Sequence, residues 1–189
     1  MKFEIKHRLS GDVLFSLETE NMKLCVEAAV RSGANLYGAN LYGANLFRAN
    51  LFRAYLFRAD LYEASGVNPY RCTPLLVLLD QPGKIRAYKL VNGNSEGPYN
   101  GGIIYKIGGT YTVSDADMQI DVKCGAGINL ATMDWCMNNW QKGYRILIAE
   151  FTAKDIAAIP TATDGKFRVS KCKIVGEKDL KEISLGVES

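Results

Sequence analysis

A period of five governs the apolar and polar positions of residues 33–66, "GANLYGANLYGANLFRANLFRAYLFRADLYEASG". Each unit places Ala and Leu two residues apart, and an aromatic residue follows the Leu. In extended backbone, residues two apart share a face, so Ala and Leu of one unit point the same way. The next Ala comes three residues after that Leu, which keeps the alternation only if the chain turns a corner. One corner per unit would close the chain on itself, with Ala and Leu inside and the rings outside.

The units resemble the pentapeptide-repeat family, whose signature is A-[D/N]-L-x-x. The resemblance implies a right-handed, quadrilateral parallel β-helix with four units per coil. Residues 20 apart would then stack at about the 4.8 Å spacing of neighbouring strands, for example Leu36 on Leu56 and Tyr37 on Phe57. The six units from Ala34 onward make about one and a half coils. Tyr55 departs from the signature, which has Asn or Asp at this position.

So short a solenoid needs caps to bury its core. Residues 2–18 predict a β-hairpin that turns at Ser10, Gly11 and Asp12. Residues 19–33 predict a short helix that ends at Gly33 and carries its apolar face on Leu24, Cys25, Ala28 and Ala29. The expected domains are therefore a cap over 1–32, the β-helix over 33–66 and a C-terminal α+β domain over 67–189.

The C-terminal pattern mixes strand and helix signals. We expect two strands around the turn at 81–84, a polar loop over 92–102, a strand over 103–113 and a helix over 128–143 with Thr132 as its N-cap. Residues 144–152 are apolar on both faces and predict a central strand. A short helix over 153–159 and a final hairpin at Asp164 and Gly165 complete the expected order.

Four stretches of this domain, "AYK", "YKIGGTY", "CGAGINLATMDW" and "YRILIAEF", resemble an uncharacterised domain common in bacteriophage proteins. That resemblance implies a phage origin. A counter-defence role belongs to the nucleotide-binding alternative below, in which the protein would sequester a host defence signal. Related sequences tend to have His where this chain has Asn129, so chemistry that depends on that histidine is not expected here.

Composition narrows the function classes. With 48% hydrophobic and 23% charged residues, the chain is typical of a folded globular protein. It has no apolar run of the roughly 18 residues that a membrane span needs, and it starts without a signal peptide's apolar stretch. Its five cysteines lack C-x-x-C spacing, and His7 is the only histidine, which argues against zinc. We expect a cytoplasmic protein without cofactor, metal or membrane contact.

The leading hypothesis is a non-enzymatic binding protein, because aromatic residues and Arg are enriched in interfaces. An outward series of rings would exceed the apolar patch that monomers usually expose, so we expect a dimer or higher homo-oligomer, or a host protein as partner. The net charge of +3 is small, and arginines on successive faces of a coil would form no track for phosphates, which disfavours nucleic acid. The predicted partner-binding residues are Tyr37, Tyr42, Phe47, Arg48, Phe52, Arg53, Tyr55, Phe57, Arg58 and Tyr62.

The alternative hypothesis is a nucleotide site in the C-terminal domain, motivated by "CGAGINLAT" and the polar loop at 92–102. Gly125 and Gly127 precede the expected helix and could cradle a phosphate, although a plain turn explains them as well. The stretch also resembles a step of ADP-ribosyltransferases, which would make Glu150 a catalytic carboxylate; otherwise Glu150 would pair with Arg145 or Arg168. The predicted ligand residues are Gly125, Gly127, Asn129, Thr132 and Glu150. No histidine lies near Cys124 in the sequence, and the pattern around it does not support a role as a nucleophile.

Overall fold

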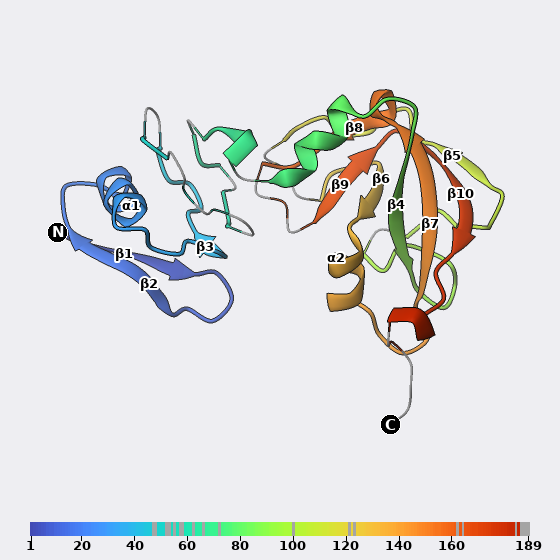
Figure 1. Cartoon of the computed structure of the whole chain (residues 1–189), viewed down its shortest axis with the longest axis horizontal. Helices are drawn as coiled ribbons and strands as arrows, with labels where there is room; N and C mark the ends of the chain where they lie inside the picture. The colour runs from blue at the N-terminus through green and yellow to red at the C-terminus, as the bar shows by residue number, and fades with distance from the viewer. Residues whose placement is uncertain are drawn as a thin grey trace. The chain divides into compact units, whose positions relative to one another are not determined.

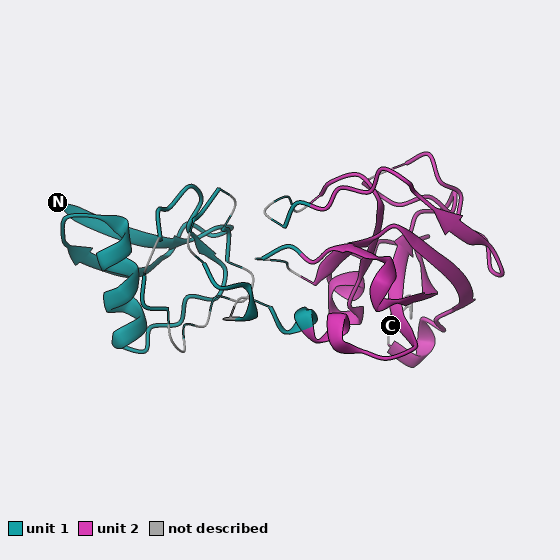
Figure 2. Cartoon of the chain, turned by 90° about the horizontal axis from the view of Figure 1, so that it is seen from above, with its two compact units in different colours: residues 1–76, 119–123, 160–164 teal, residues 77–118, 124–159, 165–189 magenta. Residues whose placement is uncertain are grey.

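The chain divides into two compact units (Figure 2), seen here in a computed structural model. The first holds Met1–Leu76 with 119–123 and 160–164, and the second holds Val77–Met118, Cys124–Ile159 and Gly165–Ser189. The structure describes all residues except 47, 48, 52, 53, 55, 57, 58, 62, 66, 72, 100, 121, 123, 162, 164, 184 and 186–189, together with the side chain of Arg71.

The predicted hairpin and helix at the N-terminus are confirmed (Figure 1). Strands β1 (Lys2–His7) and β2 (Val13–Glu18) pair antiparallel, and Ser10 Oγ donates to Asp12 Oδ2 at 2.7 Å within the turn. Helix α1 (Met22–Arg31) begins after Asn21, whose side chain accepts a hydrogen bond from the Leu24 backbone N–H at 3.0 Å. Its fully buried face is Cys25, Val26 and Ala29, so Val26 replaces Leu24 and Ala28 of the predicted face.

The repeat segment turns once in every unit, as its period predicts. The backbone N–H of each following Ala donates to the carbonyl of the Leu three residues earlier, at 2.8–3.1 Å, from Leu36–Ala39 through to Leu61–Ala64. These turns direct the Leu side chains into one core with Ile5 and α1. All six leucines of the units are buried: Leu36, Leu41, Leu46, Leu51, Leu56 and Leu61.

Residues 20 apart in the repeats are hydrogen-bonded neighbours. Asn40 forms a parallel bridge with Asp60, and Asn45 forms one with Ser65. The Leu41 N–H donates to the Asp60 carbonyl at 2.8 Å, and the Asp60 N–H donates to the Ala39 carbonyl at 2.6 Å. Strand β3 (Ala39–Asn40) also pairs antiparallel with β1, so the hairpin extends this pairing on its other side. Apart from these two isolated parallel bridges, the strands in the described residues pair antiparallel.

The second unit is a seven-stranded antiparallel sheet in the order β5-β10-β7-β4-β6-β9-β8 (Figure 1). Its strands are β4 (Lys84–Val91), β5 (Thr110–Thr112), β6 (Ile128–Ala131), β7 (Arg145–Thr152), β8 (Ile156–Ala158), β9 (Lys166–Val169) and β10 (Lys171–Glu177). Short 3₁₀ turns lie at Pro69–Arg71, Pro74–Asp80, Ala153–Asp155 and Lys181–Ile183, the first of them and part of the second in the first unit. In the described part of this unit the one α-helix is α2 (Met133–Asn138), so it is mostly β where an α+β domain was predicted.

The central position predicted for residues 144–152 is confirmed, because β7 pairs with β10 on one side and β4 on the other. Ile146, Leu147 and Ala149 are fully buried there. Strands β8 and β9 also pair on either side of the predicted final turn, of which Asp164 lies outside the described residues.

Four predicted elements were wrong in part. The apolar run before 81–84 forms the 3₁₀ turn Pro74–Asp80, which Thr73 Oγ1 starts by accepting from the Leu75 N–H, because a short apolar run does not distinguish strand from helix. Residues 128–131 are strand β6, since they pair with β9. The helix Met133–Asn138 has Thr132 as its N-cap, as predicted, but ends before the predicted Gly143. The expected helix over 153–159 is one capped turn followed by β8, and the strand over 103–113 shrinks to Thr110–Thr112.

Candidate functional site

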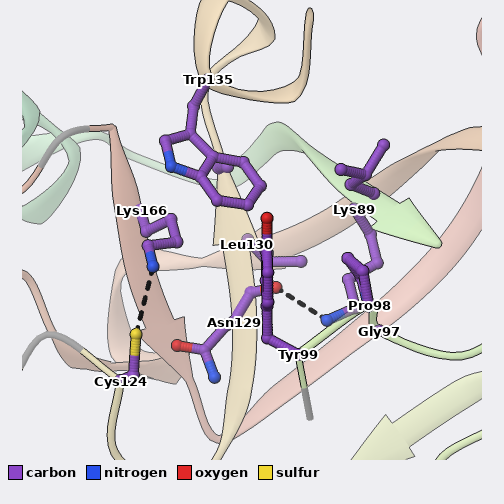
Figure 3. A pocket seen from close by; sticks show the side chains of 11 residues that line it. Lys89, Gly97, Pro98, Tyr99, Cys124, Asn129, Leu130, Trp135 and Lys166 are labelled. Atoms are coloured by element: carbon purple, nitrogen blue, oxygen red, sulfur yellow. Dashed lines mark hydrogen bonds between the residues drawn. The ribbon is translucent and has the colours of Figure 1, made fainter. Parts of the chain in front are cut away.

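A pocket in the second unit lies among β4, β6, β9, α2 and the loop before β5 (Figure 3). It encloses about 40 Å³. The polar loop predicted over 92–102 supplies Gly97, Pro98 and Tyr99 to its wall, and β6 supplies Asn129. The structure therefore brings together the two features on which the nucleotide hypothesis rested.

Asn129 carries a buried acceptor at this pocket. Its Oδ1 makes no hydrogen bond within the described part of the chain, while its Nδ2 donates to the carbonyls of Gly125 and Gly127, both at 3.4 Å. Turning the amide over would set an oxygen against these two carbonyl oxygens, so the hydrogen-bond network fixes the orientation. A buried acceptor without a partner costs about 1–3 kcal/mol, which a bound N–H or O–H group would recover.

Lys89 brings an amine to the same pocket from β4. Only 5% of Lys89 is exposed, and its Nζ donates to the backbone carbonyl of Asn129 at 3.0 Å. The ammonium also lies 4.9 Å from the centre of the Tyr105 ring. Burial lowers the pKa of Lys89 to about 8, since a charged amine loses its hydration inside the sheet.

Lys166, at the start of β9, contacts both an aromatic ring and a thiol of the pocket. Its Nζ lies 5.2 Å from the centre of the Trp135 ring and donates to Cys124 Sγ at 3.1 Å. Figure 3 shows the Asn129 carboxamide extending toward this side of the pocket. Cys124 is exposed, and in the fold the Lys166 amine lies beside its thiol.

Close packing around Gly165 holds Trp135 at the pocket. A Cβ at Gly165 would lie 2.5 Å from Thr132 Oγ1 and 3.1 Å from the Trp135 Cβ, and Gly165 has φ +118°. Only a glycine allows β9 to start this near to α2. Trp135 is consequently 6% exposed, and the Tyr99 ring meets it edge-on at 6.2 Å between centres.

The other residues predicted around Asn129 have structural contacts. Gly125 and Gly127 offer carbonyls to Asn129 Nδ2, and they precede strand β6 where a helix was expected. A Cβ at Gly125 would clash with the Asp117 carboxylate, so this spot already faces an acidic group. The Thr132 hydroxyl donates to Asp134 Oδ1, and its backbone N–H donates to the Gly165 carbonyl at 2.9 Å.

Glu150 lies on β7, apart from this pocket. It lines a separate depression of about 440 Å³ together with Lys84, Asp155 and Lys173. Its carboxylate is 2.8 Å from Lys84 Nζ and 3.6 Å from Arg86 Nε, so the expected ion pair forms with these two cations in place of Arg145 or Arg168. The hydrogen bond from Lys84 is the main reason that the pKa of Glu150 lies below its usual value.

Of the predicted interaction surface, the structure describes Tyr37 and Tyr42. Tyr37 is half-buried, and Tyr42 is 56% exposed. Tyr42 lines a groove of about 610 Å³ between the start of α1 and the repeat, with Asn40 and Asn45 on the repeat side. The other predicted partner-binding residues lie outside the described residues: Phe47, Arg48, Phe52, Arg53, Tyr55, Phe57, Arg58 and Tyr62.

Sequence reasoning missed Lys89, Tyr99, Trp135 and Lys166 as pocket residues. No spacing in the chain connects them, because they come from a strand, a loop, a helix and another strand. A lysine inside the apolar strand "KIRAYKLV" was the one available signal. Lysine is almost never fully buried without a partner, so its place among inward residues could have marked the site.

Residues 32–65 match the family model of pentapeptide repeats, in eight copies, where the sequence pattern gave six units. The match covers the repeat segment and ends before the second unit, which begins at Val77. No curated protein and no solved structure matches the chain.

None of the helices in the described residues is both long and apolar enough to cross a bilayer. The described residues also hold no group of three or more His, Cys, Asp or Glu residues arranged to bind a metal ion.

Proposed function

We propose that this chain is a non-enzymatic binding protein whose repeat segment associates with a second copy of the chain through aromatic and arginine side chains. The observation that supports the proposal is that two adjacent side chains of one repeat unit differ sharply in their exposed fraction. Leu41 is 1% exposed, whereas the adjacent Tyr42 is 56% exposed and lines a groove. The same position holds an aromatic residue in each of the other units.

We further propose that the repeats form a short right-handed parallel β-helix of about one and a half coils. Three observations support it: one turn per unit, a shared Ala and Leu core, and parallel bridges between residues 20 apart. Four five-residue units per coil give that separation. In this architecture the residue after Leu faces solvent or a partner in every unit.

Self-association is the favoured use of the surface because of the number of aromatic residues that the repeat places after its leucines. Six rings at one position of the repeat would present more apolar area than a monomer usually exposes. The arginines of the later units add side chains that are enriched in interfaces. We also propose that the chain is of phage origin. In the second form of this proposal, a host protein binds the same surface in place of a second copy.

The test is the oligomeric state of variants, measured by native mass spectrometry and light scattering over a range of concentrations. Tyr42→Ser should weaken association, and Phe47→Ser, Phe52→Ser and Phe57→Ser together should abolish it. Tyr70→Ser is the matched control, because Tyr70 is 74% exposed and lies outside the units. A wild-type protein that stays monomeric, or variants that associate as the wild type does, would refute self-association.

The enzyme alternative has less support. An ADP-ribosyltransferase-like site would need Glu150 near the residues of the "CGAGINLAT" stretch. Glu150 and Asn129 instead line different pockets, on strands that β4 separates in the sheet. The carboxylate of Glu150 is also held by Lys84 and Arg86, which leaves it poorly placed to orient an acceptor. We therefore keep ligand binding in the second unit and set transfer chemistry aside.

A further inference from the structure

The pocket around Asn129 has features that self-association through the repeats does not use. It lies wholly within the second unit and combines two amines, a buried acceptor and aromatic walls. Among the described residues that line it, none is Asp or Glu. Its charge therefore favours a ligand with a negative group.

The enclosed volume limits what can enter. About 40 Å³ is small beside the roughly 300–1,000 Å³ of pockets that take drug-sized ligands. One edge of a single ring fits such a space, and a whole dinucleotide does not. Trp135 and Tyr99 present rings set 72° apart, so a planar group can stack on one of them and meet the other edge-on.

The polar groups lie on different sides of this space. Lys89 Nζ uses one of its three N–H groups on the Asn129 carbonyl, within the described part of the chain, and approaches from β4. Asn129 Oδ1 needs a donor, and Figure 3 shows its carboxamide on the side of Cys124 and Lys166. A ligand that satisfies both would offer an acceptor to the amine and an N–H to the amide oxygen.

We propose that this pocket binds one edge of a planar, anionic heterocycle that carries a ring N–H, with the ring against Trp135 and Tyr99. The ring N–H donates to Asn129 Oδ1, a ring carbonyl accepts from Lys89, and Lys166 near the Cys124 side attracts the anionic group. The inference is independent of the repeat surface, because every residue that carries it belongs to the second unit.

Three small probes separate these contributions. Orotate has a planar ring, ring N–H groups and a carboxylate; uracil keeps the ring and the N–H groups without the charge; benzoate keeps the ring and the charge without an N–H. Titration calorimetry and tryptophan fluorescence follow binding to the full chain, since Trp135 lines the pocket and Trp140 is the only other tryptophan. Orotate should bind at least about tenfold more tightly than either partial probe, which corresponds to about 1.4 kcal/mol.

Two variants test the assigned contacts. Asn129→Leu should reduce orotate affinity to that of benzoate and leave benzoate unchanged. Lys166→Met should weaken orotate and benzoate while uracil binds as before. Lys154→Met is the control for a lost surface charge, because Lys154 is exposed and outside the pocket, and it should bind all three probes like the wild type.

The comparison of probes on the wild-type chain decides the question even if Asn129→Leu fails to fold. No saturable binding of orotate up to its solubility limit, or equal affinities for orotate, uracil and benzoate, would overturn the proposal. So would folded Asn129→Leu and Lys166→Met variants that bind orotate as tightly as the wild type. None of these outcomes affects the oligomerisation test, whose variants lie in the first unit.

Discussion

The two units bury different kinds of side chain. The repeat unit fills its core with Ala and Leu, which one short sequence rule sets, and with apolar residues of the cap. Among the described residues, the second unit buries the cations Lys89 and Arg168, of which Arg168 is 0% exposed and donates to the Asp117 carbonyl at 2.9 Å. A purely apolar core gives stability with little chemistry, whereas buried charges cost stability unless they are paired and hydrogen-bonded.

The largest effect should come from shortening a core leucine in the repeats. Leu46 is 0% exposed, so Leu46→Ala should destabilise the first unit by about 2–5 kcal/mol through lost burial and a cavity. Hydrogen exchange of the amides at 41–46 measures this, because Leu46 N–H donates to the Ser65 carbonyl across the coil. Leu9→Ala is the control, since Leu9 is 81% exposed, and an equal loss in both would contradict a leucine core.

In the second unit, the buried amine of Lys89 should make the free energy of unfolding depend on pH. The pKa of Lys89 falls from 10.5 to about 8 on folding, so the unfolded chain binds its proton more tightly. Unfolding then takes up a proton between about pH 8 and 10.5, and stability rises with pH across that window, by about 3 kcal/mol in full.

Lys89→Met removes this dependence. Denaturant unfolding, followed by tryptophan fluorescence, should show that the free energy of unfolding of the wild type rises relative to that of the variant as the pH rises from about 8 to about 10.5. Parallel profiles for the two proteins would contradict a desolvated amine.

A matched pair of glycines tests how tightly the hairpin covers the repeats. Gly38 and Gly43 hold the same place in successive units with φ +64° and +63°, so alanine at either strains the backbone by about 1–2 kcal/mol. At Gly38 a Cβ would also clash with His7 Nε2, whereas nothing lies within 4 Å at Gly43. Gly38→Ala should therefore cost more in thermal unfolding than Gly43→Ala. Equal losses would mean that His7 moves aside freely.

The smallest effect should follow the removal of the Glu150 charge in the second unit. Glu150→Gln loses ion pairs to Lys84 and Arg86; the Glu150 side chain is 14% exposed, but the two cations are 75% and 69% exposed, so water screens the pairs. The folded-state pKa of Glu150 is lowered, chiefly by the hydrogen bond from Lys84, so the stabilisation holds at neutral pH and disappears as the pH falls below 4.5. Acid titrations of the wild type and Glu150→Gln should converge in that range; a gap that persists there would contradict the ion pairing.

The sequence was sufficient where a local rule repeats. The period of five predicted the turn after every Leu, the burial of Leu41 and the exposure of Tyr42 without knowledge of any distant contact. The same reasoning failed at 128–131, because these residues become a strand only through pairing with Lys166–Val169. Lys89 and Trp135 meet for the same reason, through a sheet order that no local pattern encodes. Asn129 was predicted as a ligand residue from its neighbours in the sequence. That its Oδ1 lacks a hydrogen-bond partner in the described residues could be seen only in the folded structure.

The hairpin at the N-terminus also decides how copies of this protein can meet. An open strand edge is a template on which another chain can add, and repeated addition leads to fibres. Strand β1 pairs with Ala39–Asn40, and Asn40 pairs on its other side with Asp60. That edge of the repeat is already occupied, so copies cannot add strand by strand at Ala39–Asn40. Strand β2 is now the outer strand of this three-stranded sheet, so the hairpin moves the open edge from the repeat to the cap.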